Sequence, residues 1–140
     1  MNKYFSACLA TAVVMLVLDM LWLGVIAKPL YQSGLGHLMA ERPNWVAAVA
    51  FYVLYTLGLL LFAIVPNAAD PGWLKTAATA AMFGLVAYAT YDLSNLATLK
   101  DWPIGLSLID MAWGATLSAA AATAGQIGRA SCRERVCSTV

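Results

Sequence analysis

Charge is what this sequence has least of. Only 11% of its 140 residues are Asp, Glu, Lys or Arg, whereas 62% are hydrophobic and the mean hydropathy is +0.76. A soluble domain needs about a quarter of its residues charged to cover its surface with groups that water can solvate. This composition excludes an ordinary soluble domain and predicts an integral membrane protein.

The C-terminal tail, residues 126–140, differs abruptly from the rest of the chain. It holds three of the eight basic residues and shows no apolar periodicity. Its stretch IGRASCRERV resembles the translation of a common short-read sequencing adapter. We therefore expect the tail to be non-native and leave it out of the fold prediction, as is done for expression tags. The alternative is a genuine basic cytoplasmic tail.

Cysteine and histidine are also scarce, because outside the tail only Cys8 and His37 remain. This excludes a disulfide framework and a paired-cysteine metal site. The sequence also lacks a nucleotide-binding glycine loop, a His-Glu-x-x-His motif and a Gly-x-Ser-x-Gly motif. We therefore expect no metal and no cofactor, and the sequence favours a non-enzyme. The near-neutral body offers no basic surface for nucleic acid, so membrane lipids are the expected partners.

Long apolar runs take the place of the missing charges. Four of them are long enough to cross a bilayer, which takes about 20 helical residues, and they cover residues 5–27, 45–65, 73–96 and 103–125. Lipid offers no partner to backbone N–H and C=O groups, so the spans must be helices. We expect an all-α fold: an integral membrane bundle of four transmembrane helices in residues 1–125, with an interfacial loop at 28–44. Trp45, Trp73 and Trp102 begin spans, as interfacial anchors do.

Three aspartates interrupt these apolar runs at similar depths. With alternating helix directions and a rise of about 1.5 Å per residue, Asp19, Asp92 and Asp110 lie roughly 12, 6 and 10 Å below the same membrane face. Tyr52 reaches roughly 10 Å from that face. Small residues share helix faces with the aspartates at intervals of four, which is typical of faces that pack closely in membranes; one such row is Asp110, Gly114, Ser118 and Ala122. We therefore expect the carboxyl groups to point into the bundle.

The motif Asp-x-x-Trp occurs twice, in LDMLWLG (residues 18–24) and in IDMAWG (residues 109–114). An inverted repeat is one explanation, and convergent use of Trp as a hydrogen-bond donor beside Asp is the other. Because the two helices run in opposite directions, we expect Trp22 to lie nearer the membrane surface than Trp113.

No Lys, Arg or His lies in the interior of a predicted span. The carboxyl groups must then be neutralised by protons, by Tyr, Asn or Trp donors, or by a bound cation. Ionisable groups within a membrane usually mark a site or a pathway. The predicted intramembrane polar site comprises Asp19, Trp22, Tyr52, Tyr55, Tyr88, Asp92, Asn95, Asp110 and Trp113.

Several of these residues also carry a family resemblance. Asp19-x-x-Trp22-Leu-Gly24, Phe51-Tyr52-x-x-Tyr55, GLVAYATYDLSNLATLKDWP (residues 84–103) and Asp110-x-x-Trp113-Gly114 resemble the predicted bacterial membrane proteins of domain-of-unknown-function family 2177. The resemblance covers about residues 1–125. It implies a multi-pass protein of a bacterial inner membrane and assigns no activity.

Three functions remain open at this point. The first is a small proton- or cation-coupled transporter, which the inward carboxyl groups without counter-ions favour. The second is an intramembrane lipid-binding or lipid-modifying protein, because the polar layer lies within reach of one leaflet. The third is a structural or assembly subunit, including a homo-oligomer, in which protonated aspartates only hold helices together.

Overall fold

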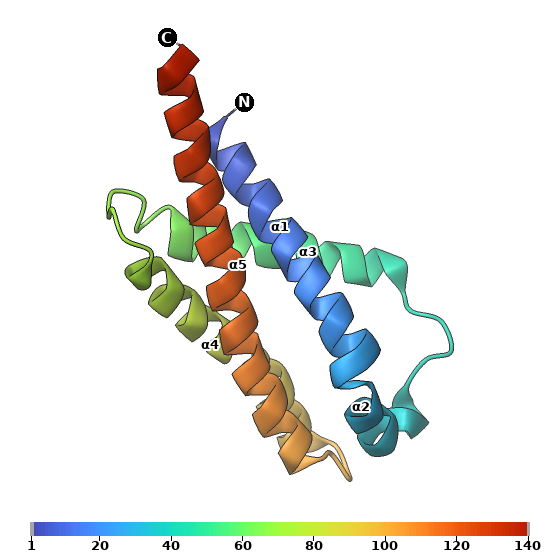
Figure 1. Cartoon of the computed structure of the whole chain (residues 1–140). Helices are drawn as coiled ribbons and strands as arrows, with labels where there is room; N and C mark the ends of the chain where they lie inside the picture. The colour runs from blue at the N-terminus through green and yellow to red at the C-terminus, as the bar shows by residue number, and fades with distance from the viewer. Residues whose placement is uncertain (1, 140) are drawn as a thin grey trace.

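The computed structural model describes the backbone of residues 2–139 and the side chains of residues 2–131, and this part of the chain is all-α, as predicted (Figure 1). The helices are α1 (Lys3–Leu21), α2 (Lys28–Leu35), α3 (Trp45–Leu59), α4 (Leu74–Thr98) and α5 (Ile104–Thr139). A π-helical turn extends α1 over Trp22–Ile26 and another extends α3 over Leu60–Ile64, and a 3-10 turn, Gly36–Leu38, follows α2.

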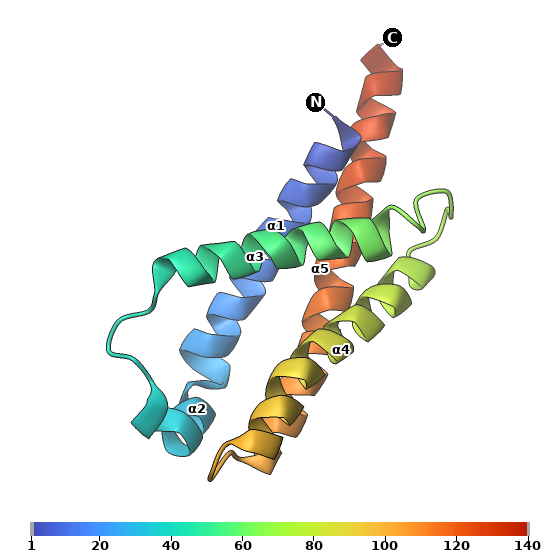
Figure 2. The ribbon, with the colours of Figure 1, turned by 180° about the vertical axis from the view of Figure 1, so that it is seen from behind.

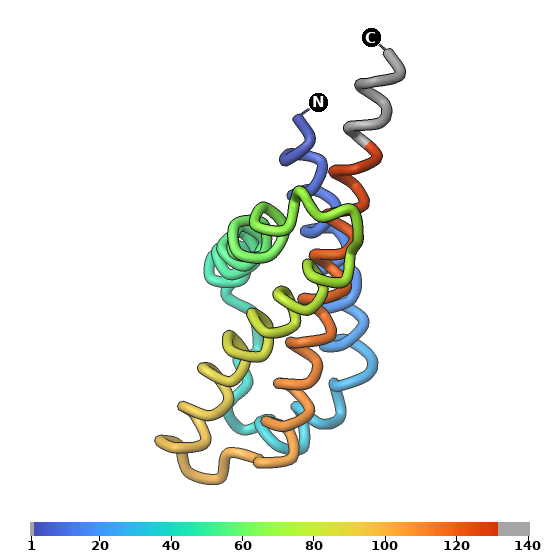
Figure 3. The backbone as a smooth tube through the Cα atoms, turned by 90° about the vertical axis from the view of Figure 1, so that its left-hand side faces the viewer, coloured from blue at the N-terminus to red at the C-terminus, as the bar shows by residue number. Residues whose placement is uncertain are grey.

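Helix α5 is the centre of the fold, because α1 and α4 both pack along it. Helix α3 instead crosses this layer, as Figure 2 shows from behind, and it is seen almost end-on in Figure 3 while the other long helices run lengthwise. The predicted arrangement of four alternating helices therefore does not describe α3, and the count of four spans stays a prediction. Helix α3 buries Tyr55, Thr56 and Leu59, and the π-helical turn that extends it buries Ala63 and Ile64, so it is the C-terminal part of this segment that packs on the layer.

Small residues bring α4 and α5 together, as the predicted small-residue rows require. A Cβ atom added to Gly84 would collide with the backbone carbonyl of Gly114, and one added to Gly114 would collide with the ring of Tyr88. Every member of the Asp110, Gly114, Ser118 and Ala122 row is buried. The inward direction predicted for this face is confirmed.

The molecule carries its polar groups inside and its large apolar side chains outside. Buried positions include threonines, serines and three aspartates, whereas leucine, valine and phenylalanine side chains are exposed along α1, α3 and α5. A surface of this kind needs lipid rather than water around it. Within the described residues, three helical segments are long and apolar enough to cross a membrane: Lys3–Ile26, Trp45–Ile64 and Ile104–Ser131. Helix α4, rich in Ala, Thr and Tyr, is not among them.

Of the three tryptophans predicted to be interfacial anchors, Trp45 and Trp73 are exposed, and their anchoring stays a prediction. Trp102 is a correction, because only 8% of it is exposed and its Nε1–H donates to Ser107 Oγ at 2.9 Å. It packs with Leu35 and Leu106 in a small second core. The indole lies inside the turn between α4 and α5, between α2 and the start of α5. Its position at the start of a predicted span did not indicate this burial.

Helix α5 does not end near residue 125 but continues to Thr139. Gln126 Nε2 donates to the carbonyl of Gly72, and Arg129 donates to the carbonyl of Ala68, both in the loop that joins α3 to α4. These contacts attach the first turn of the tail to the fold. They do not bear on whether the tail is native, which stays a prediction.

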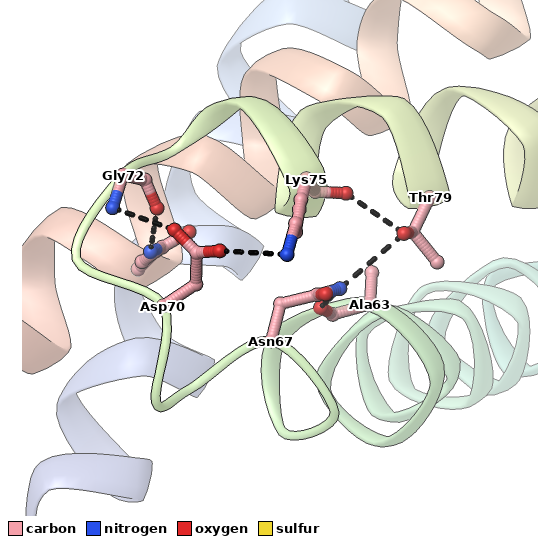
Figure 4. A network of polar contacts seen from close by, with 7 residues as sticks. Ala63, Asn67, Asp70, Gly72, Lys75 and Thr79 are labelled. Atoms are coloured by element: carbon pink, nitrogen blue, oxygen red, sulfur yellow. Dashed lines mark hydrogen bonds and ion pairs between the residues drawn. The ribbon is translucent and has the colours of Figure 1, made fainter.

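The same loop carries one ion pair (Figure 4). Asp70 accepts a hydrogen bond from the Gly72 N–H at 2.9 Å and lies 3.1 Å from Lys75 Nζ. The Gly72 N–H, and after it Lys75, lowers the pKa of the Asp70 carboxyl below its usual value. This exposed network closes the connection between α3 and α4.

Candidate functional site

Asp19, two residues before the end of α1, meets donors from two other helices. It is only 4% exposed. The Tyr52 hydroxyl of α3 donates to Oδ2 at 2.6 Å, and the Trp113 Nε1–H of α5 donates to Oδ1 at 3.2 Å. Each carboxyl oxygen thus has a neutral donor. Neither of these donors carries a positive charge, so Asp19 is hydrogen-bonded without a basic partner.

Asp110 lies in a second polar group on the other side of the site. The Tyr31 hydroxyl of α2 donates to its Oδ1 at 2.6 Å. The carboxyl group of Asp92, on α4, is close enough to form a hydrogen bond with Asp110. Two carboxylates in contact repel each other strongly away from water, so the pair is most stable when it shares one proton.

Asp92 is the most deeply buried of the three aspartates, with 1% of its surface exposed. Its Oδ2 atom has no hydrogen-bond partner. A buried polar atom without a partner is unfavourable, and the cost is larger for a charged carboxylate than for a neutral carboxyl group. The contact between Asp92 and Asp110 is therefore the point of the site where a shared proton would lower this cost.

Tyr31 was not among the predicted site residues, although it supplies the donor to Asp110. Burial, and after it the hydrogen bond to Asp110, raises the pKa of Tyr31 well above its usual range. Its hydroxyl therefore keeps its proton and remains a donor. The sequence placed Tyr31 only in the interfacial loop, and nothing in the spacing indicates that this segment folds back as α2 beneath α5.

The two tryptophans of the repeated motif stack on each other. The rings of Trp22 and Trp113 have centroids 4.5 Å apart and planes 5° from parallel. The expected difference in depth between the two residues stays a prediction, but their rings are in contact. Trp22 is the first residue of the π-helical turn that extends α1. Its Nε1–H lies near the Tyr31 hydroxyl without hydrogen-bond geometry and has no partner.

The two polar groups face one cavity of about 570 Å³, a size that suits small molecules. Seven predicted residues line it: Asp19, Trp22, Tyr52, Tyr55, Tyr88, Asp110 and Trp113. The other lining residues are Leu23, Tyr31, Ala48, Phe51, Ala87 and Tyr91. None of these is Lys, Arg or His. The cavity therefore combines two carboxyl groups with aromatic and apolar walls.

Two predicted residues lie outside the lining. Asp92 stands behind Asp110, as described above, and Asn95 is half-buried one turn further along α4 without reaching the cavity. Phe51 and Tyr91 complete the rim, and both belong to the sequence motifs quoted for the family resemblance. Tyr55 faces the interior and its hydroxyl pairs with Ser118 Oγ at 2.6 Å.

The family resemblance is confirmed by comparison with known proteins. The chain matches the family described as "Predicted membrane protein (DUF2177)" over residues 4–127, and it belongs to that family. No curated protein and no solved structure matches the chain.

Proposed function

We propose that this membrane protein binds a small cation in the cavity and exchanges it for a proton, as a small coupled transporter. The observation that carries the proposal is the presence of Asp19 and Asp110 in one cavity without a basic side chain among the lining residues. Buried carboxyl groups without a counter-charge attract either protons or a cation. Competition between the two is the simplest form of coupling.

The two polar groups suit different parts of this exchange. Asp19 accepts hydrogen bonds from Tyr52 and Trp113, and we assign to it the standing attraction for a cation. The Asp92–Asp110 pair holds the exchangeable proton beside Tyr31. When a cation enters, its field favours the doubly ionised pair, and the proton leaves to water. One positive charge enters as another departs, so the net charge of the site stays constant.

Coupled transport also requires a set of helices that cross the membrane. We propose α4 as the fourth of these transmembrane helices. Its lower hydropathy comes from the face that it turns to α5, where Thr76, Gly84 and Asp92 are buried. A helix whose polar groups are covered by protein can span although its average hydropathy is modest. A bacterial inner membrane, the location that the family resemblance implies, belongs to the same proposal.

The proposal is tested in proteoliposomes that contain a pH-sensitive dye. A cation gradient of Na⁺, K⁺ or an organic ammonium ion should drive proton movement in the native protein, and Asp110→Asn should abolish it. Asp70→Asn is the matched control, because Asp70 lies on the surface loop away from the cavity. Equal proton movement in the native protein and in Asp110→Asn would overturn the proposal, as would none in the native protein with any of these cations.

Lipid binding is the second candidate, because exposed side chains of Leu23, Phe51 and Tyr91 surround the cavity. A lipid could enter past them from the bilayer. Native mass spectrometry of the purified protein should then show one bound lipid that Asp19→Asn loses. A mass equal to that of the bare chain in both proteins would remove this candidate.

A further inference from the structure

We infer that the ligand of the cavity is a methylated ammonium group with an oxygen atom near its nitrogen. The inference rests on the proposed function, because it names the class of cation that the Asp19 and Asp110 cavity binds. It is carried by the nature of the cavity walls, by the hydrogen bonds that the polar groups already make, and by one unpaired donor.

The walls of the cavity are mostly aromatic. Eight of its thirteen lining residues are Trp, Tyr or Phe. The rings of Trp22 and Trp113 stack on each other, and those of Tyr55 and Tyr88 meet edge to face. Aromatic faces attract cations, and cages of them are the usual recognition element for methylated ammonium groups.

The hydrogen bonds already present distinguish between classes of ammonium ion. The hydroxyls of Tyr31 and Tyr52 donate to Asp110 and Asp19, and the Tyr55 hydroxyl pairs with Ser118. Both oxygens of Asp19 already accept a donor. A primary ammonium brings three N–H donors, each of which needs an acceptor and must share the carboxyl oxygens with the donors already bound to them. A quaternary ammonium brings none and needs only charge and ring faces.

One polar group in the wall still lacks a partner. The Nε1–H of Trp22 is buried, with no hydrogen bond, in a side chain that lines the cavity. A buried unpaired donor is unfavourable. A ligand oxygen two or three bonds from the ammonium nitrogen would satisfy it after a small adjustment of the ring. Amino alcohols provide this arrangement, and so do the trimethylammonium headgroups of lipids.

The test measures binding of defined probes to the purified full chain in phosphatidylglycerol nanodiscs by isothermal titration calorimetry. The probes are choline, tetramethylammonium, ethanolamine and 3,3-dimethyl-1-butanol, a neutral molecule with the shape of choline. We expect choline to bind about tenfold more tightly than the neutral molecule. Tetramethylammonium should bind more weakly than choline because it has no oxygen for Trp22. Equal binding of choline and the neutral molecule, or tighter binding of ethanolamine than of choline, would overturn the inference.

Variants of the cavity wall and of the Asp19 carboxyl group test which side chains account for the binding of choline. Trp22→Phe keeps a ring face but removes the donor, so it should remove the advantage of choline over tetramethylammonium while both still bind. Asp19→Asn should weaken both about tenfold or more. Trp73→Phe, at an exposed indole outside the cavity, is the matched control. Unchanged affinities in Trp22→Phe and Asp19→Asn, with all proteins monodisperse, would contradict the inference.

Two further experiments distinguish a lipid headgroup from a soluble ligand, and failure of the ligand class from failure of the proposed function. In phosphatidylcholine nanodiscs, a lipid headgroup that occupies the site should weaken the binding of free choline, whereas a soluble ligand leaves it unchanged; both results support the ligand class. If choline binds and no proton moves in proteoliposomes, the ligand class stands and proton coupling falls. If no ammonium probe binds while Na⁺ or K⁺ drives Asp110-dependent proton movement, the ligand class falls and the proposed function stands.

Discussion

The indole of Trp113 donates its hydrogen bond to Asp19 on α1 and not to Asp110, which lies one turn before it on α5. The tryptophan of the second motif therefore donates to the aspartate of the first motif, across the interface between α1 and α5. Trp22 does not donate to Asp110 in the same way, because its ring stacks on Trp113 and its N–H is unpaired. One explanation for the repeated Asp-x-x-Trp pattern was that each Trp donates to a carboxyl group. Only Trp113 does so, and its acceptor, Asp19, belongs to another helix.

Removal of the Trp113 Nε1–H donor should destabilise the fold. Trp113→Phe keeps an aromatic ring against Trp22 but leaves Asp19 Oδ1 without a partner. A buried acceptor that loses its donor typically destabilises a protein by about 1–3 kcal/mol. Thermal unfolding in detergent should show a lowered midpoint, with Trp73→Phe, an exposed indole, as the control. An unchanged midpoint would mean that Asp19 does not depend on this bond.

Asp19 and Tyr52 should be energetically coupled. Their hydrogen bond of 2.6 Å joins α1 to α3, and few other polar contacts connect these helices among the described residues. A double-mutant cycle of Asp19→Asn and Tyr52→Phe should give a coupling energy of about 0.5–3 kcal/mol. Asp19→Asn with Tyr4→Phe, at a tyrosine far from the site, should show none. Additive effects of Asp19→Asn and Tyr52→Phe would argue against the bond.

Two glycines should respond to alanine in opposite directions. Gly84→Ala places a methyl group against the Gly114 carbonyl, so α4 and α5 must separate, at about 1–3 kcal/mol of stability. Gly105→Ala, in the first turn of α5, meets open space and should stabilise by about 0.5–1 kcal/mol at most. Unfolding midpoints of the two variants, compared with the native protein, give the signs. A neutral Gly84→Ala would contradict the close contact.

The Asp70 carboxyl should titrate below the usual Asp range in the folded chain. Its pKa is lowered first by the Gly72 N–H and then by Lys75. A lowered folded pKa contributes stability that is present above the unfolded pKa and is lost as the pH falls through the folded value. NMR titration of the Asp70 side chain should show the low pKa, and Lys75→Met should return part of the shift while the Gly72 N–H retains the rest. Full return would assign the effect to the ion pair instead.

Much of the site could be predicted because burial of a charge in an apolar helix has few solutions. Asp19, Asp92 and Asp110 had to face protein, and the small residues spaced around Asp110 identified the contact face. Seven of the nine predicted residues line one cavity. Asn95 does not, because a residue one turn further along α4 lies beyond the cavity even though it follows the same face.

Tyr31 and the Trp22–Trp113 stack could not be predicted in the same way. Helical periodicity gives a face and a depth for each residue of a span, but it says nothing about a loop helix that folds back under the bundle. Depth along a span is a property of Cα positions, whereas indole rings extend several ångströms from the backbone. Trp102 was predicted to lie at the membrane surface because it begins a span, and its backbone position did not show that the indole turns inward.

The sequence by itself determined that this is an all-helical membrane protein with inward carboxyl groups, because a chain so poor in charge must put lipid around its apolar faces and protein around its aspartates. Only the tertiary structure decided which donor meets which carboxyl group: Trp113 and Tyr52 with Asp19, and Tyr31 with Asp110. These pairs depend on the crossing of α3, the position of α2 and the reach of long side chains. Each of those is set by packing between segments and not by the order of residues within one helix.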